Sequence, residues 1–176
     1  MFKIGIVFLC MLQLASTTSV VVPQDAHHPL RISEVMASNG YTLEDAFGRH
    51  PDWIEIHNTS NEPVSLDGYS LSDKKSKPEK YMFPKGAVIQ PGEYIIVFAS
   101  GAKKDIADEY HAPFKLSASG EAVYLSKDGI LVDAVLFGPQ LKDISFALDL
   151  DGVYKQTLTP TPGAANLITP VTPAND

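Results

Sequence analysis

Hydrophobic and polar residues alternate most regularly along residues 52–58, which read Asp-Trp-Ile-Glu-Ile-His-Asn. A repeat of two places successive side chains on opposite faces of a β-strand and does not fit the 3.6-residue repeat of a helix. One face carries Trp53, Glu55 and His57, and the other carries Ile54, Ile56 and Asn58. Trp53 is the only tryptophan of the chain, and we predict that it is buried between the two sheets of a sandwich.

Short runs of the same kind recur along the chain and are separated by turn residues. They lie at 30–36, 63–66, 69–73, 81–84, 87–89, 93–99, 114–116, 122–125 and 130–137, with a last hairpin expected around Asp151-Gly152. Asp-Gly and Pro-Gly pairs between such runs favour tight turns. No segment keeps a helical repeat, so the sequence predicts an all-β sandwich of about eight to nine short strands.

The expected core follows from the same pattern. Residues 94–99 are apolar on both faces, which predicts the most buried strand of the protein. The core side chains that we expect are Trp53, Ile54, Ile56, Tyr94, Ile96, Phe98 and Phe114.

The N-terminal residues have the pattern of a secretory signal rather than of a domain. Lys3 precedes an apolar run from Ile4 to Leu14, and small residues follow. This arrangement is typical of a signal peptide, and the run is too short to cross a bilayer, which takes about 20 apolar residues. We therefore expect a signal peptide at 1–19, a flexible segment at 20–29, a β-sandwich domain at 30–166 and a proline-bearing tail or linker at 167–176. His27 and His28, in the flexible segment, are expected to be exposed.

The composition of the chain limits the kinds of partner and chemistry that can be expected. The chain has 14 basic and 21 acidic residues, and loss of Lys3 with the signal leaves 13 basic ones and a net charge of about −8. A surface of this sign repels phosphate backbones, so no nucleic acid is expected as a partner. The only cysteine, Cys10, lies in the signal, which excludes disulfides and a thiol nucleophile from the mature chain. We expect no membrane insertion after signal cleavage and a secreted, extracellular or periplasmic protein.

Several motifs in order resemble the lamin-tail domain family in its bacterial, secreted form. The first two are Ile32-x-Glu34-Val35-Met36-Ala37-Ser38-Asn39 and Asp52-Trp53-Ile54-Glu55-Ile56-x-Asn58. Leu66-x-Gly68-x-Ser70-Leu71-Ser72-Asp73, Ile89-x-Pro91-Gly92-x-Tyr94 and His111-x-x-Phe114-Lys115-Leu116-Ser117 follow, and Pro160-Thr161-Pro162-Gly163-x-x-Asn166 closes the series. Ala112-Pro113 departs from the family pattern, which more often has a polar pair there. The resemblance implies an immunoglobulin-like β-sandwich that has no catalytic centre and uses no cofactor.

Candidate chemistry is sparse. Asp52, Glu55 and His57 lie on or beside one strand, and His111 lies in a loop before Phe114. We interpret Glu55 and His57 as the solvated face of a half-buried strand, and a small metal-ligand cluster is the alternative. Asp149-Leu150-Asp151-Gly152 resembles half of a calcium loop but lacks the later bidentate glutamate, so a turn is expected.

Two further patterns are kept as hypotheses. Glu34, Glu55 and Glu121 fall at or near strands, and glycoside hydrolysis would need two such carboxyls across a cleft. Asn58-Thr59-Ser60 is a glycosylation sequon, which has meaning only in a eukaryote.

These observations favour an exported, non-catalytic binding or adhesion module that recognises a protein or a cell-surface polymer. One alternative is a small metal-dependent hydrolase whose metal is held by His57, His111 and nearby acids. The other is an accessory domain fragment of a larger secreted protein, with the tail as its linker. Fold alone does not decide among these functions.

Overall fold

The computed structural model describes residues 28–171, and all regular structure in this range is β-strand. The expected signal peptide, most of the segment at 20–29 and the last residues of the tail lie outside the described residues. The strands are β1 (Leu30–Met36), β2 (Asp52–Asn58), β3 (Val64–Ser65), β4 (Tyr69–Ser72), β5 (Tyr81–Met82), β6 (Val88–Ile89), β7 (Tyr94–Ala99), β8 (Tyr110–His111), β9 (Glu121–Lys127), β10 (Ile130–Phe137), β11 (Ser145–Leu148) and β12 (Tyr154–Thr157). No helix among the described residues is long and apolar enough to cross a membrane.

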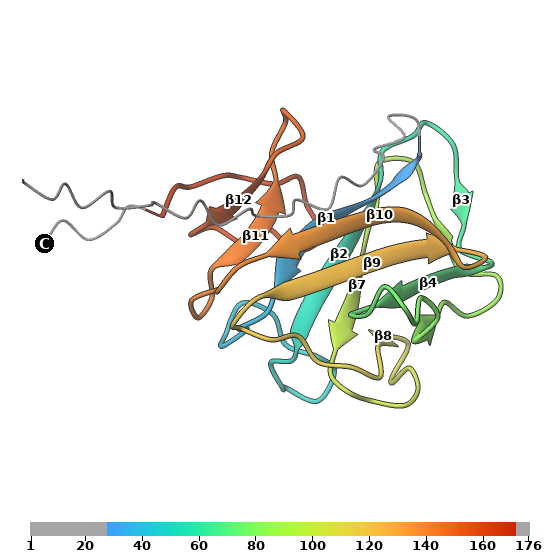
Figure 1. The fold of residues 1–176 in the computed structure, drawn as a ribbon, viewed down its shortest axis with the longest axis horizontal. Coiled ribbons are helices and arrows are strands. Elements are labelled where there is room, and N and C mark those ends of the chain that lie inside the picture. The colour runs from blue at the N-terminus through green and yellow to red at the C-terminus, as the bar shows by residue number, and fades with distance from the viewer. Residues whose placement is uncertain (1–27, 172–176) are drawn as a thin grey trace, which may run out of the picture.

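Two sheets pack face to face and form a sandwich (Figure 1). The large sheet has the strand order β12-β11-β1-β2-β7-β8, and the small sheet has the order β10-β9-β4-β5. β3 and β6 form a separate two-stranded ribbon. All pairings are antiparallel except that of β7 with β8. The predicted all-β sandwich is confirmed, but residues 114–116 form no strand, and the edge strand is β8 instead.

The main core lies between the two sheets and is built from one face of each. Alternation along β1 and β2 turns Ile32, Ile54 and Ile56 inward, where none of them has exposed surface. From the small sheet they meet Leu71, Val123 and Leu125, which are equally buried. The ring of Phe114 belongs to this core although its backbone is a loop.

A β-bulge in β1 decides which side chains reach the outer face of the large sheet. Ile32 pairs with Ile56 and Glu34 pairs with Glu55, so Ser33 is the extra residue. A bulge of this kind re-aims a side chain locally. The Ser33 hydroxyl consequently donates a hydrogen bond to Glu55, on the face opposite to the main core.

Trp53 is buried, but the prediction that it lies between the two sheets is wrong. It belongs to a second, smaller cluster with Met36 and Phe98, against which Leu43 and Ile96 also pack. Because Ile54 and Ile56 face the main core, alternation sends Trp53 to the outer face of the large sheet. There the segment between β1 and β2 covers it.

The prediction that β7 is the most buried strand is also wrong. Its last three residues are buried, whereas Tyr94, Ile95 and Ile96 are half-buried. β8 pairs with β7 only at Val97 and Phe98, so the first half of β7 is an edge of the sheet. Tyr94 and Ile96 are therefore not part of the main core.

Residues 158–170 also cover the outer face of the large sheet, at the end away from Trp53. We call this segment the C-terminal strap. The Asn166 amide donates to the carbonyl groups of Ser33 and Leu148 at 2.9 Å each. Leu158 N donates to Thr169 O, and Pro170 bridges to Thr157. Residues 167–170 thus pack on β12, and the ordered domain extends beyond the expected boundary at 166. His28 likewise packs edge-on against Tyr69 and is not fully exposed.

Candidate functional site

The two histidines singled out from the sequence lie at separate places. His57 stacks on Tyr94 with ring centroids 4.1 Å apart, and His111 stacks on Phe98 at 5.2 Å. His57 pairs with Tyr94 and His111 pairs with Phe98, so the two histidines are offset by four residues along β7. At roughly 3.3 Å per residue the offset is about 13 Å, which is too long for two ligands of one metal ion.

Each histidine has a local structural role. His111 has no exposed surface, and its Nδ1 lies 3.0 Å from the Ser100 hydroxyl. Its Nε2 lies 3.4 Å from Glu109. Burial lowers the pKa of His57, although a hydrogen bond with the backbone of Gly92 opposes this. Residues 28–171 hold no group of three or more side chains placed to bind a metal.

Glu55 is not solvated, which corrects the interpretation of its strand face. It has no exposed surface and lies under the C-terminal strap. Ser33 Oγ donates to one carboxyl oxygen, and Gly163 N donates to the other at 2.6 Å. Burial raises the pKa of Glu55 to about 8, against these hydrogen bonds and with help from the charge of Glu34.

Glu34 is the register partner of Glu55 and is bound in the same way. Ser145 Oγ and the backbone and hydroxyl of Thr161 donate to its carboxyl group. Burial raises its pKa, and these hydrogen bonds oppose the rise. Neither Glu34 nor Glu55 has exposed surface, so this carboxyl pair fastens the strap and does not line a cleft that a glycoside could enter.

Asp52 is the first residue of β2 and lies in the wall of an open pocket of about 320 Å³. Burial raises its pKa, while hydrogen bonds from the backbone of Asn39 and Leu116 and the charge of Lys115 oppose the rise. The pocket is lined by Arg49, His50, Pro51, Asp52, Ala99, Ser100 and Lys115. Of the sequence-derived candidates, Asp52 alone lines this pocket.

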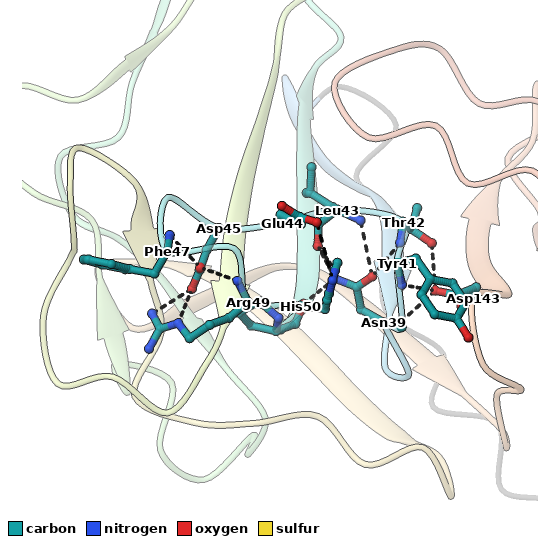
Figure 2. Close-up of polar contacts among 12 residues, drawn as sticks. Asn39, Tyr41, Thr42, Leu43, Glu44, Asp45, Phe47, Arg49, His50 and Asp143 are labelled. Atoms are coloured by element: carbon teal, nitrogen blue, oxygen red, sulfur yellow. Dashed lines mark hydrogen bonds and ion pairs between the residues drawn. The ribbon is translucent and has the colours of Figure 1, made fainter.

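The segment that forms one wall of this pocket and covers Trp53 is residues 37–51, which we call the anchored loop. It is irregular, yet its hydrogen bonds are dense (Figure 2). Asn39 is its first anchor: Oδ1 accepts from Thr42 N at 3.1 Å, and Nδ2 donates to Leu43 O and Pro51 O. Asparagine side chains favour such turns because they bond nearby backbone groups.

Asp45 is the second anchor and is buried in the middle of the loop. Its Oδ1 accepts from the N–H groups of Phe47 and Arg49, and its Oδ2 accepts from the Arg49 guanidinium at 2.7 Å. Burial alone would raise the pKa of Asp45, but these hydrogen bonds and the charge of Arg49 outweigh it and lower the pKa. The carboxylate therefore stays ionised and fixes both residues.

Asp143 is the third anchor and comes from the connection between β10 and β11. Its Oδ1 accepts from Gly40 N at 2.7 Å, Tyr41 N at 2.9 Å and the Thr42 hydroxyl at 3.0 Å. Burial again acts against these donors, yet the net pKa of Asp143 is lowered. A carboxylate about a hundred residues away in the sequence thus holds the first turn of the loop (Figure 2).

The anchored loop presents two aromatic rings to solvent, each beside a cation. The exposed fraction is 73% for Tyr41 and 63% for Phe47. The Lys142 amino group lies 3.9 Å from the centre of the Tyr41 ring, and the Arg49 guanidinium lies 5.1 Å from that of Phe47. Exposed aromatics on a fixed loop are the type of residue that dominates binding surfaces.

The sequence alone did not single out Tyr41 and Phe47, because the loop that presents them is fixed in part by a residue far away in the chain. The spacing of Asp45 and Arg49, four residues apart, was the available signal for a closed turn. Nothing in the local sequence indicated that Asp143 would bind the first turn of the loop.

The structure also shows the role of two other sequence motifs. Asp149 Oδ1 accepts from Asp151 N and Val153 N and closes a hairpin turn. The buried Asn58 amide donates to Glu62 O and Ile89 O, so it is not an accessible glycosylation site in the folded chain.

Two sheets packed face to face around the main core, antiparallel except for the pairing of β7 with β8, define an immunoglobulin-like β-sandwich. The Lamin Tail Domain family model matches residues 23–138, which is more than half of the chain. The chain therefore belongs to the lamin tail domain family, whose domains are often involved in binding and are generally non-catalytic. No curated protein gives a significant match.

Proposed function

We propose that this protein is an exported, non-catalytic binding module and that its anchored loop is the surface that recognises a protein or a cell-surface polymer. The observation that carries the proposal is the pair of exposed rings, Tyr41 and Phe47, on a loop fixed by Asn39, Asp45 and Asp143. A loop ordered before binding loses little conformational entropy on complex formation.

The geometry supports this function over the alternative of a metal-dependent hydrolase. His57 and His111 are offset along β7, and the buried pair Glu34 and Glu55 fastens the strap. The pocket beside the loop is open and carries Arg49, Lys115 and Asp52, which can hydrogen-bond a polar ligand. Export rests on the N-terminal pattern of a charged residue, an apolar run and small residues.

The binding proposal predicts that both rings contribute to affinity. A partner is first selected from arrays of extracellular polysaccharides and matrix proteins, and its Kd is measured by biolayer interferometry. Phe47→Ala and Tyr41→Ala should each weaken binding about fivefold or more, because aromatic residues buried at the centre of an interface commonly contribute over 1 kcal/mol. Leu150→Ala, at a fully exposed position in the β11–β12 hairpin, is the matched control and should leave Kd unchanged. Unchanged affinity in both ring variants would contradict the proposal.

The export proposal predicts processing of the N-terminus. Protein recovered outside the cell should begin between Ser16 and Ala26, as read by N-terminal sequencing. A chain that begins at residue 20 should remain inside the cell. Secreted protein that still begins at Met1 would show that residues 1–19 are not a cleaved signal.

A further inference from the structure

The first half of β7 is an edge of the large sheet. β7 pairs with β2 along its whole length, but β8 covers it only at Val97 and Phe98. Among the described strands, none pairs with Tyr94, Ile95 or Ile96 on that side. An edge of this kind offers backbone hydrogen-bonding groups to an additional strand.

A groove of about 310 Å³ lies directly at this edge, and we call it the β7 groove. It is lined by Leu43, Glu44, Ile95, Ile96, Phe98, Asp108, Glu109 and Tyr110. Ile95 and Ile96 point to opposite faces of β7, so the groove wraps around the strand edge. Its floor is therefore apolar at the place where an added strand would lie.

The rim of the β7 groove is acidic. Glu44, Asp108 and Glu109 line it, and its lining contains no lysine or arginine. The Glu44 side chain is 63% exposed and lies 3.6 Å from His50, while Asp108 is exposed. A ligand that brings positive charge and apolar side chains would match this rim and floor.

The groove is formed before any ligand binds. Ile106 and Glu109 exchange both backbone hydrogen bonds, at 3.1 and 2.9 Å, and Ala107 and Asp108 between them adopt left-handed backbone. Glu109 Oε2 accepts from Ala46 N at 2.9 Å, which ties this turn to the anchored loop. A fixed rim and floor lower the entropic cost of docking.

We propose that the β7 groove binds an extended, basic segment of a partner protein, which adds a strand beside Tyr94–Ile96. Alternate side chains of that segment enter the apolar floor, and its lysine or arginine side chains pair with Glu44 and Asp108. Leu43 and Glu44 of the anchored loop line this groove, but the exposed rings of Tyr41 and Phe47 do not, so the proposal does not depend on what those rings bind.

The test uses capped heptapeptides as probes and the ¹⁵N-labelled protein from residue 20 onward. A peptide of alternating lysine and valine should shift the amide resonances of Tyr94, Ile95 and Ile96 at millimolar concentration. A peptide with glutamate in place of lysine should shift them at least tenfold more weakly. The double variant Glu44→Lys, Asp108→Asn should abolish this preference, because the Glu44 side chain is exposed and asparagine tolerates the left-handed backbone of Asp108. Leu150→Ala, at a fully exposed position in the β11–β12 hairpin, should bind the lysine peptide as the wild type does.

Several results would overturn the proposal. Shifts that map away from β7, or equal binding of both peptides to the wild type and the double variant, would exclude a charge-matched strand. Concentration-dependent dimerisation through these same amides, seen by sedimentation, would assign the edge to a second copy of the chain. Binding of an anionic polysaccharide in place of the peptide would also exclude it.

Discussion

Replacement of Trp53 by alanine should lower the free energy of unfolding by about 3–5 kcal/mol. Trp53 has no exposed surface, and the cluster that it forms with Met36 and Phe98 would collapse around a large void. A loss of this size is a large share of a typical stability of about 5–15 kcal/mol, so much of the variant should be unfolded at 37 °C. Urea denaturation followed by circular dichroism measures the change.

Trp53→Phe is the conservative comparison and should cost clearly less than Trp53→Ala. The Trp53 Nε1 group is buried and has no hydrogen-bond partner among the described residues, so a phenyl ring gives up volume but no hydrogen bond. Leu150→Ala, at an exposed position, should stay within about 0.5 kcal/mol of the wild type. A Trp53→Ala variant with an unchanged denaturation midpoint would show that the outer cluster adds nothing to stability.

The position of Trp53 also shows what the alternating pattern could and could not predict. Alternation identified β1 and β2 as strands and gave the correct partition of side chains between the two faces of β2. In β1 the bulge at Ser33 shifts this partition, so Ile32 and Val35 both face the main core. Alternation could not tell which face is the main core, because both faces of β2 are buried. The covering segments, the anchored loop and the C-terminal strap, have no periodicity of their own, and polar side chains hold them in place.

The candidate site was out of reach of the sequence for the same reason. Its decisive contacts join residues far apart in the chain, such as Asp143 with Gly40 and Thr161 with Glu34. By contrast, turns were predictable where a glycine occupies a backbone conformation that other residues adopt only with strain. Gly129, between β9 and β10, has φ of 76°, a left-handed conformation that glycine adopts without strain.

The stability of the protein should fall as pH rises from about 5 to 8, because of Glu55. In the unfolded chain a glutamate loses its proton near pH 4.3, whereas burial under the strap raises the pKa of Glu55 to about 8. Between these values the folded protein keeps a proton that the unfolded chain has lost, so each unit of rising pH favours unfolding. At about 1.4 kcal/mol per unit, one such proton is worth roughly 3–4 kcal/mol across the window.

Burial also raises the pKa values of Glu34, Asp52 and Glu121, so these groups act with the same sign as Glu55. The remaining shifted groups act in different pH windows or with the opposite sign. The pKa values of Asp45 and Asp143 are lowered, so they contribute stability that is lost only as pH falls below about 4. The pKa of His57 is lowered as well, and this group opposes the Glu55 effect below about pH 6.5, because the unfolded chain then binds the proton. A His57→Gln variant should therefore show a steeper loss of stability between pH 5 and 6.5.

Melting temperatures measured at pH 5, 6, 7 and 8 should fall by on the order of 10 °C for the wild type. Glu55→Gln cannot ionise, and its amide oxygen can accept from Gly163 N while its NH2 group donates to the Ser33 hydroxyl. Its melting temperature should therefore fall clearly less than that of the wild type over the same range, and the remaining fall comes from the other carboxyl groups with raised pKa values, such as Glu34. At pH 8 the variant should be the more stable protein, because it avoids placing a charge beside Glu34 under the strap. Thr161→Ala, which removes the hydroxyl donor to Glu34 but leaves both carboxyl groups, should keep the wild-type slope. Parallel pH profiles for the wild type and Glu55→Gln would mean that Glu55 is ionised in the folded protein at neutral pH.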